Sequence, residues 1–191
     1  MVLIVCEGGK TEPYYFSGLR DALRLNTANI EICGKECSSS PRGVVDFAIQ
    51  KYNSGKYYDR VYCVFDKDKH ETYNEALAWI KKKKLEKGHK ILAITSVPCF
   101  EVWFLLHYRY SSSGYVACQR SICEQVIKDL KQHIPEYEKG SGDIYRQIQD
   151  KTDTAVTNAK KLSHHNTVVQ TDNPSTKVHQ LVEYLTNLRK R

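Results

Sequence analysis

The feature that most constrains the fold is a regular alternation, over the first half of the chain, of short apolar runs with amphipathic helical patterns. The runs over residues 2–6, 61–65 and 91–94 are of the kind found in buried strands of a sheet, and Ile30 and Ile32 alternate with polar neighbours as in a short strand. Helical stripes lie between them, starting near Pro13, at Pro41 and at residue 71. This β-α-β-α-β-α-β order predicts an α/β fold, with a parallel sheet, right-handed crossovers and helices on its faces.

The pattern changes at Pro98, beyond which it is helical. We predict one structural domain overall, with an α/β core over residues 1–97 and a helical extension over residues 98–191 that adds helices around one edge of the sheet. The helix that starts at residue 71 is expected to run to residue 87 and to end at Gly88. The extension is expected to begin with a buried helix over residues 100–108. Three further helices are expected after it: one that starts at a capping box at 121–124, one over 143–163, and one over 175–189 with Ser175 or Thr176 as its cap.

Charge and composition narrow the class of partner. The chain has 191 residues, of which 41% are hydrophobic and 27% charged, as in a soluble globular domain, and its net charge of +7 favours nucleic acid over membrane as a partner. No stretch has the length of a transmembrane helix or the pattern of a signal peptide. The seven cysteines lack zinc-ligand spacing. A cytoplasmic protein that does not associate with membranes is therefore expected.

A glycine-lysine-threonine triplet follows the first apolar run and resembles the end of a phosphate-binding P-loop. The P-loop requires a glycine five residues before Gly9, and Ile4 stands there. The chain is therefore not expected to bind nucleotides through a P-loop.

Carboxylates follow two of the predicted strands. Glu7 comes directly after the first strand, and Asp66 and Asp68 come after the third. The carboxyl ends of parallel strands meet at one edge of the sheet, and residues i and i+2 of an extended segment share a face. Three carboxylates there would repel one another unless a cation neutralised them, and Mg²⁺ prefers such oxygen ligands. The alternative for each acid taken singly is a helix cap or a solvated loop residue.

Five further residues are candidates for the site, and three of them have a stated alternative. Lys10 either holds a scissile phosphate or is a surface lysine, and His70 either contacts phosphate or is incidental to the site. Glu101 stands among apolar residues, where its charge needs compensation, either from a helix N-terminus or from a place in the acidic site with a second metal ion. Lys139 could line a substrate cleft together with Tyr137, and Lys67 is a candidate contact to nucleic acid.

Longer stretches of the sequence resemble a known family. Glu7-Gly8 after a buried strand, with Asp66-x-Asp68 after a later one, looks like the TOPRIM fold shared by topoisomerases, primases and OLD-type nucleases. The segments "VCEGGKTEPYYF", "FDKDKH", "PCFEVWFLLHY" and "NPSTKVHQLVEYL" resemble the RloB-like family of bacterial defence proteins. This resemblance implies a TOPRIM-like Rossmannoid sheet with a helical C-terminal half.

The resemblance also implies an activity. TOPRIM enzymes break or join nucleic-acid strands with Mg²⁺, for which Mn²⁺ can substitute; Asp66 and Asp68 would be metal ligands, and Glu7 a general acid/base or metal-linked carboxylate. We therefore expect a nuclease acting on RNA or DNA in anti-phage defence, controlled by an ABC-type ATPase partner. Two alternatives remain: a non-catalytic subunit of an ATPase complex, and a nucleotidyl or phosphoryl transferase using the same metal site. Homo-oligomerisation is left open.

Overall fold

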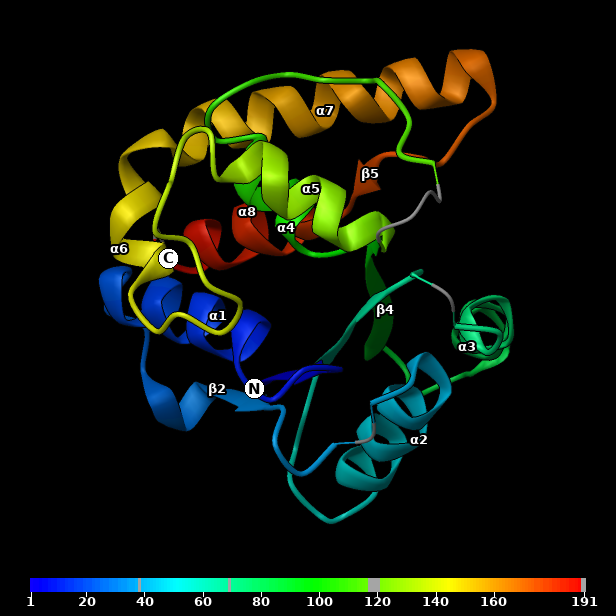
Figure 1. Cartoon of the computed structure of the whole chain (residues 1–191). Helices are drawn as coiled ribbons and strands as arrows, with labels where there is room; N and C mark the ends of the chain where they lie inside the picture. The colour runs from blue at the N-terminus through cyan, green and yellow to red at the C-terminus, as the bar shows by residue number, and fades with distance from the viewer. Residues whose placement is uncertain (38, 69, 117–120, 190–191) are drawn as a thin grey trace.

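The computed structural model of the chain describes residues 1–37, 39–68, 70–116 and 121–189 (Figure 1). Its centre is a five-stranded sheet with the strand order β2-β1-β3-β4-β5. The first four strands are parallel, and β5 runs antiparallel to β4. The predicted parallel sheet is thereby confirmed. The strands are β1 Val2–Cys6, β2 Ile30–Cys33, β3 Arg60–Asp66, β4 Lys90–Val97 and β5 Ser175–Thr176.

Helices cover both faces of this sheet. On one face α2 and α3 pack against Leu3, Val5 and Cys63, and on the other face α1 and the C-terminal helices pack against Ile4 and Val64. Alternate strand residues point to opposite faces, which is why consecutive positions of β1 are apolar. The helices are α1 Thr11–Ala22, α2 Pro41–Tyr52, α3 Tyr73–Lys82, α4 Glu101–Leu105, α5 Ile122–Leu130, α6 Ile144–Ile148, α7 Thr152–Val169 and α8 Val178–Arg189, with 3-10 turns at Thr27–Asn29 and Gln149–Lys151.

The C-terminal half is helical as predicted, but its placement differs from the prediction. Its helices cover one face of the sheet rather than gathering around one edge. They do so because that face of the central strands is apolar and must be removed from water. Among the described elements of this half, β5 forms an edge of the sheet, where Thr176 pairs with Ser96.

Several predicted boundaries are wrong. Helix α3 ends at Lys82, within a run of four lysines whose mutual repulsion disfavours another helical turn, and Gly88 instead occupies a turn with φ 92°. The helix expected over residues 143–163 is divided into α6 and α7 by a 3-10 turn. The last helix begins at Val178, after β5. The hydroxyl of Thr176 accepts a hydrogen bond from the Val178 N–H (3.2 Å), so Thr176 still binds an N–H group at the start of this helix. The capping box at Ser121 and Glu124 is confirmed.

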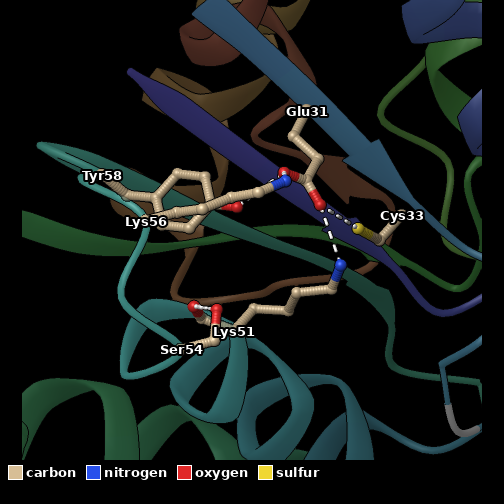
Figure 2. Close-up of polar contacts among 6 residues, drawn as sticks. All are labelled: Glu31, Cys33, Lys51, Ser54, Lys56 and Tyr58. Carbon is tan, nitrogen blue, oxygen red and sulfur yellow. Dashed lines mark hydrogen bonds and ion pairs between the residues drawn. The ribbon is translucent and has the colours of Figure 1, made fainter. Parts of the chain in front are cut away.

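A polar network fastens the outer strand β2 to the rest of the sheet (Figure 2). The Glu31 carboxylate accepts hydrogen bonds from Lys51 and Lys56 (both 2.8 Å) and from the Tyr58 hydroxyl (2.6 Å), as Figure 2 shows. Partial burial alone would raise the pKa of Glu31, but these donors lower the pKa to about 2. One carboxylate thus connects β2 with α2 and with the segment that leads into β3.

No helix within the described ranges is both long and apolar enough to cross a membrane.

Candidate active site at the carboxyl edge of the sheet

The strand order reverses between β1 and β3, and Glu7 and Asp66 stand at the carboxyl ends of these two strands. Loops diverge at such a switch point, and open α/β sheets bind their ligands there. The Glu7 N–H donates to the Val64 carbonyl (3.0 Å), a bond that belongs to the last pair of the β1–β3 ladder, Cys6 with Val64. The Glu7 Oε2 in turn accepts a hydrogen bond from the Asp66 N–H (3.1 Å). The structure therefore brings these two predicted site residues together.

Asp66 is fixed by the segment that follows β4. Its Oδ2 accepts a hydrogen bond from the Phe100 N–H (3.0 Å). Two residues further along the chain, the Asp68 N–H donates to the Pro98 carbonyl (3.0 Å). Burial, and then the nearby charges of Glu12 and Glu101, raise the pKa of Asp66 well above its usual range. An acid in such surroundings favours either a proton or a cation.

Glu12 is a member of this acidic group that the sequence analysis missed. It lies in the first turn of α1, and only 7% of its surface is exposed. Burial raises the pKa of Glu12 to about 7, and the charges of Glu101 and Glu7 act in the same direction. Its carboxylate lies against Gly8, where an added Cβ would come within 2.4 Å of Glu12 Oε2. In the sequence this residue resembles an ordinary acid in the first turn of a helix, so no local signal marked it.

Glu101 is fully buried at the start of α4. Its Oε1 accepts a hydrogen bond from the Tyr137 hydroxyl (3.0 Å), and the Lys139 Nζ lies 3.8 Å from the same oxygen. Within the described part of the chain, no group donates a hydrogen bond to Glu101 Oε2. Both alternatives for this residue fit its position: it is the first residue of α4, and its charge raises the pKa values of Glu12 and Asp66.

An open hollow of about 420 Å³ adjoins these acids at the N-terminus of α1. The loop between α5 and α6 passes over the start of α1 (Figure 1) and brings Lys139 and Gly140 to this hollow. Gly140 has φ 83° and lies against the side chain of Lys10, where an added Cβ would meet the Lys10 Cδ at 3.0 Å. The hollow is lined by Gly8, Gly9, Lys10, Thr11, Glu12, Lys139 and Gly140.

Two of the predicted site residues, Asp68 and Lys67, do not line the hollow, whereas a third is in the site. Asp68 is exposed and has φ 27°, although its charge still raises the pKa of Glu7. Lys67 turns to the opposite side and pairs with Asp172. His70 is in the site: its Nε2 lies 2.8 Å from Glu7 Oε1. The pKa of Glu7 is raised by burial, while the Asp66 N–H and His70 oppose that rise.

The donor chemistry suits a hard divalent cation, because the site gathers carboxylates and leaves one buried oxygen, Glu101 Oε2, without a donor among the described residues. The side-chain positions are not those of an assembled metal site. Among the residues that the structure describes, no three His, Cys, Asp or Glu side chains are placed to hold one ion together. The carboxylates are the type of ligand that a divalent ion prefers. To bind one ion together, the side chains of Glu7, Asp66 and Asp68 would have to move closer to one another.

The chain is thus an α/β protein whose mostly parallel sheet carries an acidic site at the β1–β3 switch point, and lysines border this site. The sequence profile of the RloB-like protein family matches residues 2–185, and the chain belongs to that family. Neither the comparison with curated proteins nor that with solved structures found a significant match.

Proposed function

We propose that the chain is a metal-dependent nuclease of the TOPRIM type, which cleaves RNA or DNA as the effector of a bacterial anti-phage system. The observation that carries the proposal is the convergence of Glu7, Glu12, Asp66 and Glu101 beside a hollow that two lysines border. Phosphodiester hydrolysis needs cationic help for the phosphate and a group that accepts a proton from water. Both needs can be met at this edge of the sheet.

The substrate phosphate would occupy the hollow. The first N–H groups of α1 lack partners within the helix, and the helix dipole favours an anion at this end. Lys10 on the rim supplies a positive charge to a phosphate oxygen. The net charge of +7 assists the approach of a polyanion.

Glu7 would take the proton from the attacking water. Its Oε2 is fixed by the Asp66 N–H, which orients the carboxylate for this role. When bound, Mg²⁺ or Mn²⁺ would be held by Glu7, Asp66 and Asp68, and it would polarise the phosphate and lower the pKa of water. His70, at 2.8 Å from Glu7 Oε1, would hold the carboxylate in place until substrate arrives.

The test is a panel of end-labelled RNA, DNA and nucleoside triphosphates incubated with purified protein and Mg²⁺. We expect strand cleavage that is abolished by EDTA and by Asp66→Asn, and reduced at least 100-fold by Glu7→Gln. Lys67→Ala is the matched control, because Lys67 pairs with Asp172 away from the hollow, and it should retain cleavage. Transfer of a nucleotide from a triphosphate, without strand cleavage, would instead identify a transferase.

One observation favours a second candidate, the non-catalytic subunit of a defence complex. The described side chains do not form a ready three-ligand metal site, and His70 occupies one oxygen of Glu7. A non-catalytic subunit would bind nucleic acid or the ATPase partner without cleaving any member of the panel. Both proposals include an ABC-type ATPase partner, which derives from the family resemblance, and a cytoplasmic location, which derives from the cysteine content and the lack of a signal-peptide pattern in the sequence.

A further inference from the structure

The loop between α5 and α6 directs two donors at a single buried acid. Tyr137 and Lys139 are two residues apart, and both approach Glu101 Oε1, at 3.0 Å and 3.8 Å respectively. Tyr137 is 2% exposed and packs edge-on against Phe104, so this part of the loop is anchored in the core. The backbone that carries Lys139 is therefore held close to Glu101, although the lysine side chain itself is half exposed.

Lys139 reaches the acids from the solvent side. Its side chain is 55% exposed and lines the hollow together with Glu12, while Glu101 beneath it is fully buried. Two carboxylates thus face one ammonium group on this side of the site. On the other side Glu7 and Asp66 are joined through the Asp66 N–H, and the exposed Asp68 follows directly. The Glu101 side of the acidic group faces the permanent positive charge of Lys139, whereas on the other side Glu7 is contacted by His70, which is charged only when protonated.

We propose that the ammonium of Lys139 takes the place of a second divalent ion at Glu12 and Glu101, so that the chain binds one divalent ion only, at Glu7 and Asp66. This inference rests on the metal dependence proposed above. A fixed positive charge 3.8 Å from Glu101 repels a divalent ion that approaches the same oxygens. A second ion would also need a nearly complete shell of oxygen ligands, and Lys139 occupies part of the space where its waters would lie.

The test is a count of bound Mn²⁺ per chain, by equilibrium dialysis with electron paramagnetic resonance of the free ion, without substrate. We expect one ion per chain for the wild-type protein and two for Lys139→Gln, which removes the charge and frees the two acids. Lys139→Arg keeps the charge and should bind one ion. Lys10→Gln removes the other lysine of the hollow and should also bind one, so the effect belongs to Lys139 in particular. Adding Glu101→Gln to Lys139→Gln should return the count to one.

The outcomes separate this inference from the proposed function. Two ions in the wild-type protein, or one in a Lys139→Gln protein with an unchanged circular dichroism spectrum, would overturn the inference and leave a metal-dependent nuclease standing. No ion in the wild-type protein would overturn both. If Lys139→Gln fails to fold, the wild-type and Lys139→Arg counts still decide, because two ions in either contradict the inference.

Discussion

Single residues at the sheet edge differ in how their charge is compensated. The carboxylates of Glu7 and Asp66 each accept a backbone N–H from a neighbouring segment, whereas Glu101 relies on the side chains of Tyr137 and Lys139. Backbone donors cannot move away without unfolding the segment, but side-chain donors can. Binding of an ion or a substrate is therefore expected to rearrange the contacts of Glu101 before those of Asp66.

The first prediction at this scale concerns metal stabilisation. Mg²⁺ or Mn²⁺ should raise the melting temperature by mass action, because the ordered site exists only in the folded state. At an ion concentration about 100 times the dissociation constant the gain is about 2.7 kcal/mol, which corresponds to several degrees. Asp66→Asn and Asp68→Asn should each lose this response, yet leave the metal-free protein as stable as before or slightly more so, because each relieves repulsion among the acids.

Differential scanning fluorimetry measures the response, in samples without metal and in samples whose metal concentration rises in 10-fold steps. Lys67→Ala should keep it, and Glu7→Gln should keep part of it. Full stabilisation of both Asp→Asn variants would show that the ion, if bound, does not use these ligands.

Glu12 leads to a prediction about pH. Its pKa is about 7 in the folded chain against 4.5 for an ordinary glutamate, so between these values the folded state holds a proton that the unfolded state has released. Unfolding then releases that proton, and the free energy of unfolding of the metal-free protein falls as pH rises from about 4.5 to 7, by at most about 1.4 kcal/mol per pH unit for this group. Asp66 and Glu7, with pKa values also raised, add to the slope.

Glu12→Gln should flatten this slope, which urea unfolding in EDTA at several pH values would measure. Glu138→Gln, which removes an exposed acid from the nearby loop, is the control and should leave the slope unchanged. A Glu12→Gln slope equal to that of the wild-type protein would mean that Glu12 is ionised in the folded chain.

Among the elements, β2 depends most on a polar contact. It is the outermost strand on its side of the sheet, and Glu31 ties it to Lys51 of α2 and to Tyr58. Glu31→Gln should lower the free energy of unfolding by about 1–3 kcal/mol, because the charge-assisted hydrogen bonds are lost. The pKa of Glu31 is lowered to about 2, so its contribution is present above pH 4.5 and is lost as pH falls towards 2.

Urea unfolding at pH 7 and at pH 3 distinguishes this effect from a general change in charge. The difference between wild type and Glu31→Gln should shrink at the lower pH. Glu36→Gln, at an exposed position of the following loop, should cost little at either pH. Equal losses for the two variants would argue against a specific role of the Glu31 network.

The elements that the sequence predicted well are those with a long apolar pattern. Residues 2–6 form β1 with the expected bounds, because every position of that strand is buried. The strand β5 has two residues, too few to show any period, and it is defined by its pairing with β4 rather than by its own side chains. The split between α6 and α7 was hidden for a similar reason, since a 3-10 turn keeps nearly the same spacing of apolar residues.

For the whole molecule, the boundary at residue 97 separates two sequence patterns but not two cores. Ile4, Val64 and Ile94 of the sheet share one cluster with Trp103 of α4 and Leu181 of α8. A fragment of residues 1–97 keeps α1 but would expose the part of that face that the C-terminal helices cover. It should therefore not melt cooperatively and should bind a dye for exposed apolar surface.

Circular dichroism melting of the fragment, beside the full chain, is the measurement. A matched control is the full chain with Trp103→Ala, which should melt cooperatively at a lower temperature because a large buried side chain is lost. Cooperative melting of the fragment would show that the first half is an independent folding unit.

The candidate site could be predicted only in part from the sequence. Glu7, Asp66 and Asp68 were found because strand ends of a parallel sheet meet, which is a property of topology. Glu12 and the contact between Glu101 and Lys139 depend on how α1, α4 and a distant loop pack together. No local pattern encodes that packing, and in the sequence Glu12 resembles an ordinary acid in the first turn of a helix.

The distance along the chain between Glu101 and the loop that faces it sets an order of events during translation. The four acids lie within the first 101 residues, whereas Tyr137 and Lys139 follow later and β5 later still. A ribosome needs on the order of ten seconds to pass from Glu7 to Lys139. Throughout that interval the nascent polypeptide carries its acids without the hydroxyl and the ammonium that will face Glu101. A product that stops short of residue 137 therefore contains every carboxylate of the site and cannot assemble it.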